Sequence, residues 1–184
     1  SAVSIRDICR QVQIKESSIY YHFTNKQAIL DELLHQFEEK SAGLMSTLEQ
    51  AMTSLAAPAE GNFYQTVCDI FFEDYLMDPF CNKLMRLLQI EKFHNSEIQK
   101  IYDHWMFEKP LAFQEQIFAR LMEASVIPPG DSRYLALRYY APVYFFAERW
   151  LFCGILSEKR KNAFRTEANC HIKKFFSEIG REAG

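Results

Sequence analysis

The sequence predicts an all-α protein, and three observations carry that prediction. Apolar residues recur at spacings of three and four along most of the 184 residues. Few stretches alternate apolar and polar residues in the manner of a half-buried strand. The chain holds 6 glycines and 6 prolines, few enough to leave long helical patterns unbroken, and its 48% hydrophobic content is ample for a packed core.

The sequence before the segment "AAPAEG" predicts two short helices followed by a long one. Ser4 is a candidate N-cap for a helix whose apolar positions are Val3, Ile5, Ile8, Cys9 and Val12. A second short helix is expected over 15–21. Thr24 and Asn25 then precede a long aliphatic helix that ends near the segment "AAPAEG", the clearest linker candidate.

The following segments are more apolar and predict a larger helical body. Helices are expected over 63–77, 79–93 and 96–107, with Asp78 as the N-cap and Pro79 in the first turn of the second. Pro110 opens a further helix that "IPPGD" ends, and Asp131 caps the next. Pro142 lies inside that next helix, where it removes a backbone hydrogen bond and favours a bend.

The last two helices, over 131–156 and 158–179, predict dimerisation. The first has apolar residues on two sides, so it needs two surfaces to pack against. The second carries one long apolar stripe. In a monomer this pair could be core, whereas in a homodimer it would meet its symmetry mate as a four-helix bundle. The predicted interface residues are Tyr139, Phe146, Trp150, Phe164, Ala168, Ile172 and Phe175.

Composition excludes several classes of protein. The net charge of -3 and the pI near 6.0 give no global nucleic-acid signature, so any DNA-binding surface must be local. The 5 dispersed cysteines argue against disulfides and zinc knuckles, and we expect a reducing cytoplasm. No apolar run is long enough to cross a bilayer, and the start has no signal-peptide pattern.

Enzyme and metal sites are weakly supported. His94 and His104 lack the spacing of metal ligands, and we predict no metal and no cofactor. A triad of Asp31, His35 and Ser41 would lie along one exposed helix without a nucleophile elbow, so no catalytic residue is predicted.

The N-terminal pattern is that of a helix-turn-helix unit. A recognition helix carries small or polar side chains at its start, where it enters the major groove. Lysine, serine and glutamate side chains can address base edges, and tyrosine, histidine and lysine can hold phosphates. We expect one of the adjacent Tyr20 and Tyr21 to pack inward. The predicted DNA-binding residues are Ser4, Arg6, Lys15, Glu16, Ser17, Ser18, Tyr20, Tyr21, His22 and Lys26.

The stretch "VSIRDICRQVQIKESSIYYHFTNKQAIL" resembles the DNA-binding segment of the tetracycline-repressor (TetR) family of bacterial regulators. The resemblance covers about the first forty residues. It implies a DNA-binding domain over 1–40 and a helical effector-binding and dimerisation domain over 41–184. The family's first helix would lie upstream of Ser1, its turn Ala-Gly is replaced by Val12-Gln13, and its Ser or Thr opening the recognition helix is replaced by Lys15.

The aromatic content of the second domain suggests a ligand cavity or simply a core. We predict a cavity, with Phe71, Tyr75, Phe93, Trp105, Phe113, Tyr140 and Tyr144 as its lining. The function predicted is a ligand-responsive regulator, chiefly a repressor, that binds a palindromic operator as a homodimer and is released by a small apolar or aromatic effector. The alternative is a helical small-molecule-binding or adaptor protein that has lost operator binding.

Overall fold

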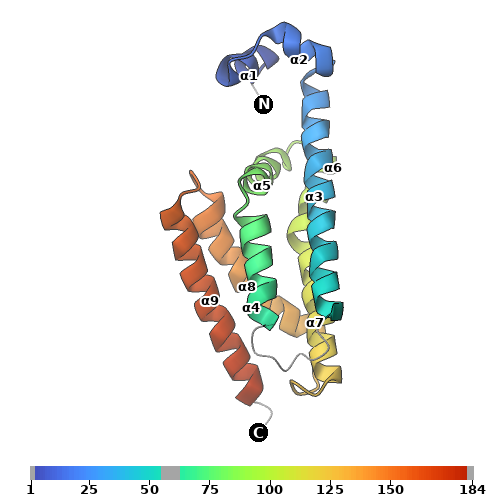
Figure 1. Ribbon diagram of the computed structural model, residues 1–184, viewed down its shortest axis with the longest axis vertical. Coiled ribbons are helices and arrows are strands. Elements are labelled where there is room, and N and C mark those ends of the chain that lie inside the picture. Colours follow the sequence, from blue (N-terminus) through green and yellow to red (C-terminus); the bar gives the residue numbers. More distant parts are fainter. Residues whose placement is uncertain (1–2, 55–62, 182–184) are drawn as a thin grey trace. The chain divides into compact units, whose positions relative to one another are not determined.

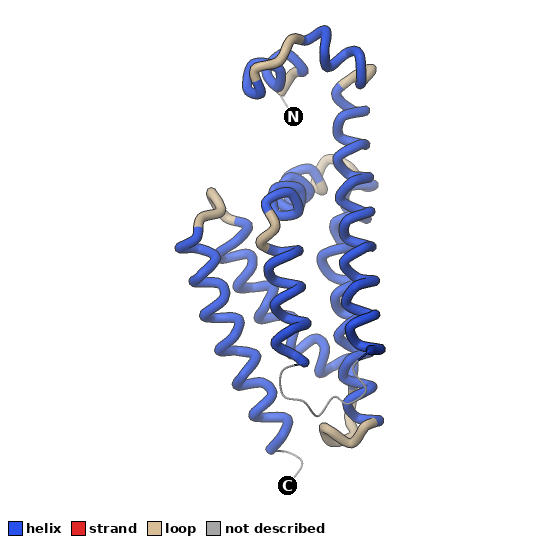
Figure 2. Tube along the Cα trace, viewed as in Figure 1, coloured by secondary structure: helices blue, strands red, loops and turns tan. Residues whose placement is uncertain are grey.

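The protein is all-α over the residues that the structure describes. The computed structural model describes residues 3–54 and 63–181, and every regular element in these ranges is helical (Figure 2). The predicted fold class is confirmed. The predicted linker, residues 56–61, lies outside the described residues.

The chain divides into two compact units, Ser1–Lys40 and Ser41–Gly184. The first unit contains α1 (Ile5–Val12), α2 (Glu16–His22) and the start of α3 (Lys26–Ser54). The boundary between the units falls inside α3, so one continuous helix belongs to both. Asn25 accepts a hydrogen bond from the Ala28 N–H, at 2.9 Å, as predicted for the start of this helix.

The turn between α1 and α2 follows from local chemistry. Ser4 caps α1 through a reciprocal capping box with Asp7, which confirms the predicted N-cap. Gln13 then takes a left-handed conformation, with φ 57°, that lets its N–H bond to the carbonyl of Cys9. A left-handed conformation that glycine adopts at a lower free-energy cost is thus adopted here by glutamine. Lys15 precedes α2 and provides no side-chain cap.

The second unit is a body of consecutive helices (Figure 1). Asp78, Asn95 and Asp131 each accept backbone N–H groups at the start of a helix, and the caps predicted at Asp78 and Asp131 are confirmed. The elements after α3 are α4 (Phe63–Phe71), η1 (Phe72–Leu76), α5 (Pro79–Glu91), α6 (Ser96–Asp103), η2 (His104–Glu108), α7 (Lys109–Glu123), α8 (Ser132–Ala147), η3 (Glu148–Phe152) and α9 (Glu158–Arg181).

The long apolar stripe of α9 is part of the core of this unit. In Figure 1, α9 runs alongside α8. The Phe164 ring packs edge-on against Phe72, with centroids 4.9 Å apart, and the Phe175 ring packs against Phe118 at 5.6 Å. The stripe residues are all buried within the protomer: Phe164, Ala168, Ile172, Phe175 and Ile179.

Among the described residues of the second unit, three π-helical turns, η1, η2 and η3, interrupt the helices, and the sequence did not predict them. A π turn changes the backbone bonding pattern, and such turns are frequent at functional sites. Here buried side chains bond to their carbonyls. The Tyr75 hydroxyl donates to the carbonyl of Trp105 at 3.2 Å, and the Tyr140 hydroxyl donates to that of Met106 at 2.7 Å.

Candidate DNA-binding surface and effector cavity

Helix α2 has a wide exposed polar face and a small apolar face. Ile19 of α2 and Cys9 of α1 are buried, and α1 and α2 contact each other. The two adjacent tyrosines are both exposed, Tyr20 by 54% and Tyr21 by 85% of their surface. The expectation that one of them packs inward is therefore wrong. Two neighbouring phenol groups at the end of α2 are free to donate to an external acceptor.

The start of α2 is equally open. The side chains of Lys15, Glu16, Ser17 and Ser18 are exposed. The Nε of Arg6 on α1 lies 3.5 Å from a carboxylate oxygen of Glu16, so two predicted DNA-binding residues pair with each other. Both side chains are largely in solvent, where such a pair contributes little free energy. A phosphate or a base edge can therefore compete for either partner.

The remaining predicted DNA-binding residues lie at helix ends: Ser4 before α1, His22 at the end of α2 and Lys26 at the start of α3. The Ser4 hydroxyl is engaged in the α1 cap: it donates to Asp7 at 2.6 Å, and that bond lowers the pKa of the Asp7 carboxyl. The His22 ring packs edge-on against Tyr21, with centroids 4.9 Å apart. Lys26 is half-buried in the first turn of α3.

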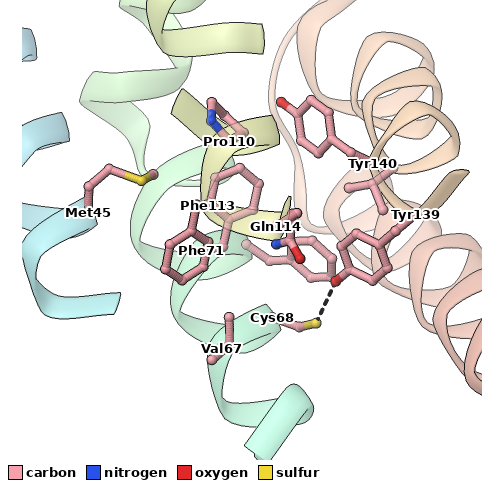
Figure 3. A pocket seen from close by; sticks show the side chains of 11 residues that line it. Met45, Val67, Cys68, Phe71, Pro110, Phe113, Gln114, Tyr139 and Tyr140 are labelled. Atoms are coloured by element: carbon pink, nitrogen blue, oxygen red, sulfur yellow. Dashed lines mark hydrogen bonds between the residues drawn. The ribbon is translucent and has the colours of Figure 1, made fainter. Parts of the chain in front are cut away.

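A narrow cavity lies in the second unit between α3, α4, η1, α7 and α8. Its volume is about 10 Å³, close to the minimum that holds one water molecule. Figure 3 shows its aromatic walls, with the hydroxyl of Tyr139 and the thiol of Cys68 3.0 Å apart. None of its lining residues carries a charge: Met45, Val67, Cys68, Phe71, Phe72, Pro110, Phe113, Gln114, Tyr139, Tyr140 and Val143.

Three of the seven predicted effector-pocket residues, Phe71, Phe113 and Tyr140, line this cavity. Tyr75 and Trp105 are buried but do not line it, and Phe93 is 79% exposed on the segment after α5. The cavity also uses Met45, Cys68 and Gln114. The sequence did not predict these three lining residues, because they come from three different helices and share no sequence pattern.

Tyr144 belongs to a closed ring of hydrogen bonds instead. Its hydroxyl donates to Glu148 at 2.5 Å and lies 2.6 Å from the hydroxyl of Tyr102. The amide of Gln89 bonds to both Tyr102 and Glu148 and closes the ring. Burial, together with the carboxylate of Glu148, raises the pKa of the Tyr144 phenol.

The predicted dimer residues lie mostly inside the protomer. Tyr139 is buried, as are the four on α9, whereas Phe146 and Trp150 are half-buried. The indole N–H of Trp150 donates to Glu167 on α9 at 3.0 Å. A different set on α8 is exposed at helical spacing: Tyr134, Leu137, Ala141 and Phe145. We call these four residues the α8 face.

Other kinds of site are not found in the described part of the chain. Within residues 3–54 and 63–181, no group of three histidine, cysteine, aspartate or glutamate side chains is placed to hold a metal ion. No helix in the same ranges is both long enough and apolar enough to span a membrane.

Two short helices joined by a tight turn, the second of them exposed, and then a long helix have the layout of a helix-turn-helix unit. Residues 1–33 match the bacterial regulatory proteins of the tetR family. A solved structure from Mesorhizobium loti MAFF303099, assigned to the TetR family of transcriptional regulators, has the same fold. It matches with a TM-score of 0.67 and 21% identity, over 95% of this chain and 85% of that chain. No curated protein matches the sequence. The family match is confined to residues 1–33, and the likeness to the solved structure shows that the two chains share a fold.

Proposed function

We propose that the protein is a repressor that binds a palindromic operator as a homodimer and is released by a small uncharged effector. The observation that carries the proposal is the face of α2, where Lys15 to Ser18 and Tyr20 to His22 are all exposed while Ile19 is buried. Serine and lysine at the start of the helix would read base edges. Tyr21 and His22 at its end would donate to phosphates.

The homodimer is supported by the α8 face. Tyr134, Leu137 and Phe145 are each at least half exposed, although all three are large apolar side chains. An apolar stripe of this kind marks an interaction surface, and a two-fold dimer would pair the stripe with its own copy. The two recognition helices of such a dimer would lie about 34 to 36 Å apart, one turn of DNA.

The effector is proposed to enter the aromatic cavity of Figure 3. A cavity of about 10 Å³ is too small for any organic ligand, so binding must displace the aromatic walls. Because the lining carries no charge, a charged effector would lose its hydration without compensation, and an uncharged one is expected. Gln114 supplies an amide for orientation. The effector and the operator would be linked by a coupling free energy of about 1 to 3 kcal/mol, carried by α3 because it belongs to both units.

This function requires a cytoplasmic location, where operator DNA is found, and it assigns no catalytic step. The experiment is selection of genomic DNA fragments by the protein at two salt concentrations, followed by sequencing. We expect a palindrome whose affinity falls steeply as salt rises.

The DNA-contact assignment is tested with variants of α2. Tyr21→Phe combined with His22→Ala should weaken binding of the selected operator by about tenfold or more, since two charge-facing donors are lost. His94→Ala, at an exposed histidine of the second unit outside every proposed site, is the matched control and should leave affinity unchanged. Undiminished affinity in the α2 double variant would contradict the phosphate contacts. The absence of any enriched sequence would favour the helical small-molecule-binding alternative.

A further inference from the structure

A cleft at the N-terminal end of α8 is larger than the aromatic cavity and separate from it. It lies where the segment after α7 meets the first turns of α8 and the end of α9, and its volume is about 220 Å³. The lining residues are Ile127, Pro128, Pro129, Gly130, Asp131, Tyr134, Leu135, Arg138 and Ile179. None of them lines the aromatic cavity.

The size of the cleft sets the size of its ligand. A cavity of about 150 Å³ lined by apolar side chains accommodates benzene, so a volume near 220 Å³ has room for one six-membered ring and one small substituent. The walls favour a ring. Pro128 and Pro129 offer flat apolar surfaces, and Tyr134 contributes an aromatic face.

The positive charge of Arg138 in the cleft favours a ligand whose substituent is a carboxylate. Arg138 has a guanidinium carbon 5.9 Å from the ring centre of Tyr134, and a nitrogen 3.6 Å from a carboxylate oxygen of Glu178. That distance is too long for a hydrogen bond. No described residue accepts a hydrogen bond from this guanidinium in the structure, and its five N–H donors match a carboxylate in a bidentate geometry.

Asp131, the acidic residue of the cleft, does not remove the preference for a carboxylate ligand. Asp131 is committed to the α8 cap, where its carboxylate accepts the Tyr134 N–H at 2.9 Å. The N-terminus of α8 also offsets its charge. Arg138 also pairs with Glu178 at 3.6 Å, so a ligand carboxylate would bind the guanidinium N–H groups that no described residue accepts.

We propose that this cleft binds a small aromatic monocarboxylate, with the ring between the prolines and Tyr134 and the carboxylate on Arg138. The site shares Tyr134 with the α8 face but no residue with the aromatic cavity, and its argument does not use the proposed operator or effector.

The probe is benzoate, titrated into the full chain by calorimetry and by NMR detection of the ligand. Arg138→Gln should weaken benzoate binding by about tenfold or more. Arg138→Lys should weaken it by a smaller factor, because lysine keeps the positive charge but cannot bind a carboxylate in the bidentate geometry of arginine. Benzyl alcohol, which keeps the ring without the charge, should bind at least about tenfold more weakly than benzoate. Arg133→Gln is the matched control, because Arg133 lies on the same helix, pairs with Glu115 and does not line the cleft.

Two further measurements keep the result interpretable. Unfolding temperature checks that each variant folds, and the oligomeric state is measured in parallel because Tyr134 also belongs to the α8 face. Phe113→Leu alters the aromatic cavity alone and should leave benzoate binding unchanged. No saturable binding of benzoate, equal binding by folded Arg138→Gln, or a loss of binding in Phe113→Leu would each overturn the proposal.

Discussion

The imidazole Nε2 of His171 lies 3.0 Å from the carbonyl oxygen of Tyr139 and joins α9 to α8. A carbonyl oxygen only accepts hydrogen bonds, so this nitrogen carries the proton. The side chain of the same tyrosine reaches the thiol of Cys68 on α4. Tyr139 therefore connects a wall of the aromatic cavity to the last helix, since its side chain contacts Cys68 and its backbone carbonyl accepts the hydrogen bond from His171.

Replacing His171 by alanine should lower the free energy of unfolding by about 1 to 2 kcal/mol, because a partly buried donor and its ring contacts are lost. His171→Gln keeps an N–H donor at a similar reach and should recover part of this loss. Chemical denaturation monitored by circular dichroism measures both. If alanine and glutamine were equally destabilising, the hydrogen bond would not be the source of the effect.

The turn at Gln13 should be improved by glycine. Gln13 has a φ of 57°, which costs a side-chain-bearing residue free energy that glycine does not pay. Gln13→Gly is expected to stabilise the first unit by about 0.5 to 1 kcal/mol, after the larger chain entropy of unfolded glycine is subtracted. Thermal unfolding measures this.

Ser125 has the same φ of 57° in the second unit and provides a parallel test of the same argument. Ser125→Gly should raise the stability of that unit by a similar amount. Gln13→Ala should give no gain, since alanine keeps the Cβ, and a gain from alanine equal to that from glycine would contradict the argument.

The cysteines should differ sharply in reactivity. Burial raises the pKa of the Cys68 thiol to about 11, from an ordinary value near 9.0. The thiolate is the reactive form, so native Cys68 should resist iodoacetamide at pH 8. Cys170 is exposed and should be alkylated much faster than Cys68. Mass spectrometry of the peptides distinguishes them, and equal rates at the two sites would show that Cys68 is not enclosed.

The ion pair between Arg165 and Glu73 should make the stability of the protein depend on pH. Arg165 holds Glu73 through two short contacts, of 2.6 and 2.8 Å, and these bonds lower the pKa of the Glu73 carboxyl below its ordinary value of about 4.5. A lowered pKa in the folded state means that the stabilisation is present above pH 4.5 and is lost as pH falls through the folded-state value.

Arg165→Gln should therefore flatten the acid limb of the stability curve. Because both side chains are partly exposed, the difference from the wild type between pH 6 and pH 3 should be only about 0.5 to 1 kcal/mol. Arg133→Gln removes an exposed arginine of a different pair and should leave the acid limb unchanged. A parallel shift of the Arg165→Gln curve at all pH values would indicate lost packing rather than lost charge pairing.

The helices and their caps could be predicted because they follow from local chemistry. Ser4, Asp78 and Asp131 each precede an apolar periodicity, and each caps a helix in the structure. The candidate DNA-contact residues could also be chosen from local sequence, since a short recognition helix uses only a few consecutive side chains.

What the sequence could not predict depends on long-range packing. The stripe of α9 is equally suited to a core or to a dimer, and the structure uses Phe164 in the core against Phe72. Phe93 has the composition of a pocket residue and lies in solvent. The π turns have no sequence signature here, because they depend on buried donors, such as Tyr140, that come from other helices.

Asn82 gives the sharpest prediction about these π turns. It is fully buried, and its amide nitrogen donates to the carbonyl of Leu76 in η1 at 3.0 Å and to that of Leu151 in η3 at 3.2 Å. Asn82→Leu keeps the volume but leaves both carbonyls without this donor, so it should cost about 2 to 4 kcal/mol. Asn95→Ala removes the cap of α6, on the surface, and should cost only about 1 kcal/mol. Urea denaturation compares the two. Equal losses would mean that η1 and η3 do not depend on Asn82, whereas a larger loss at Asn82 would identify this amide as the link that holds two distant π turns together.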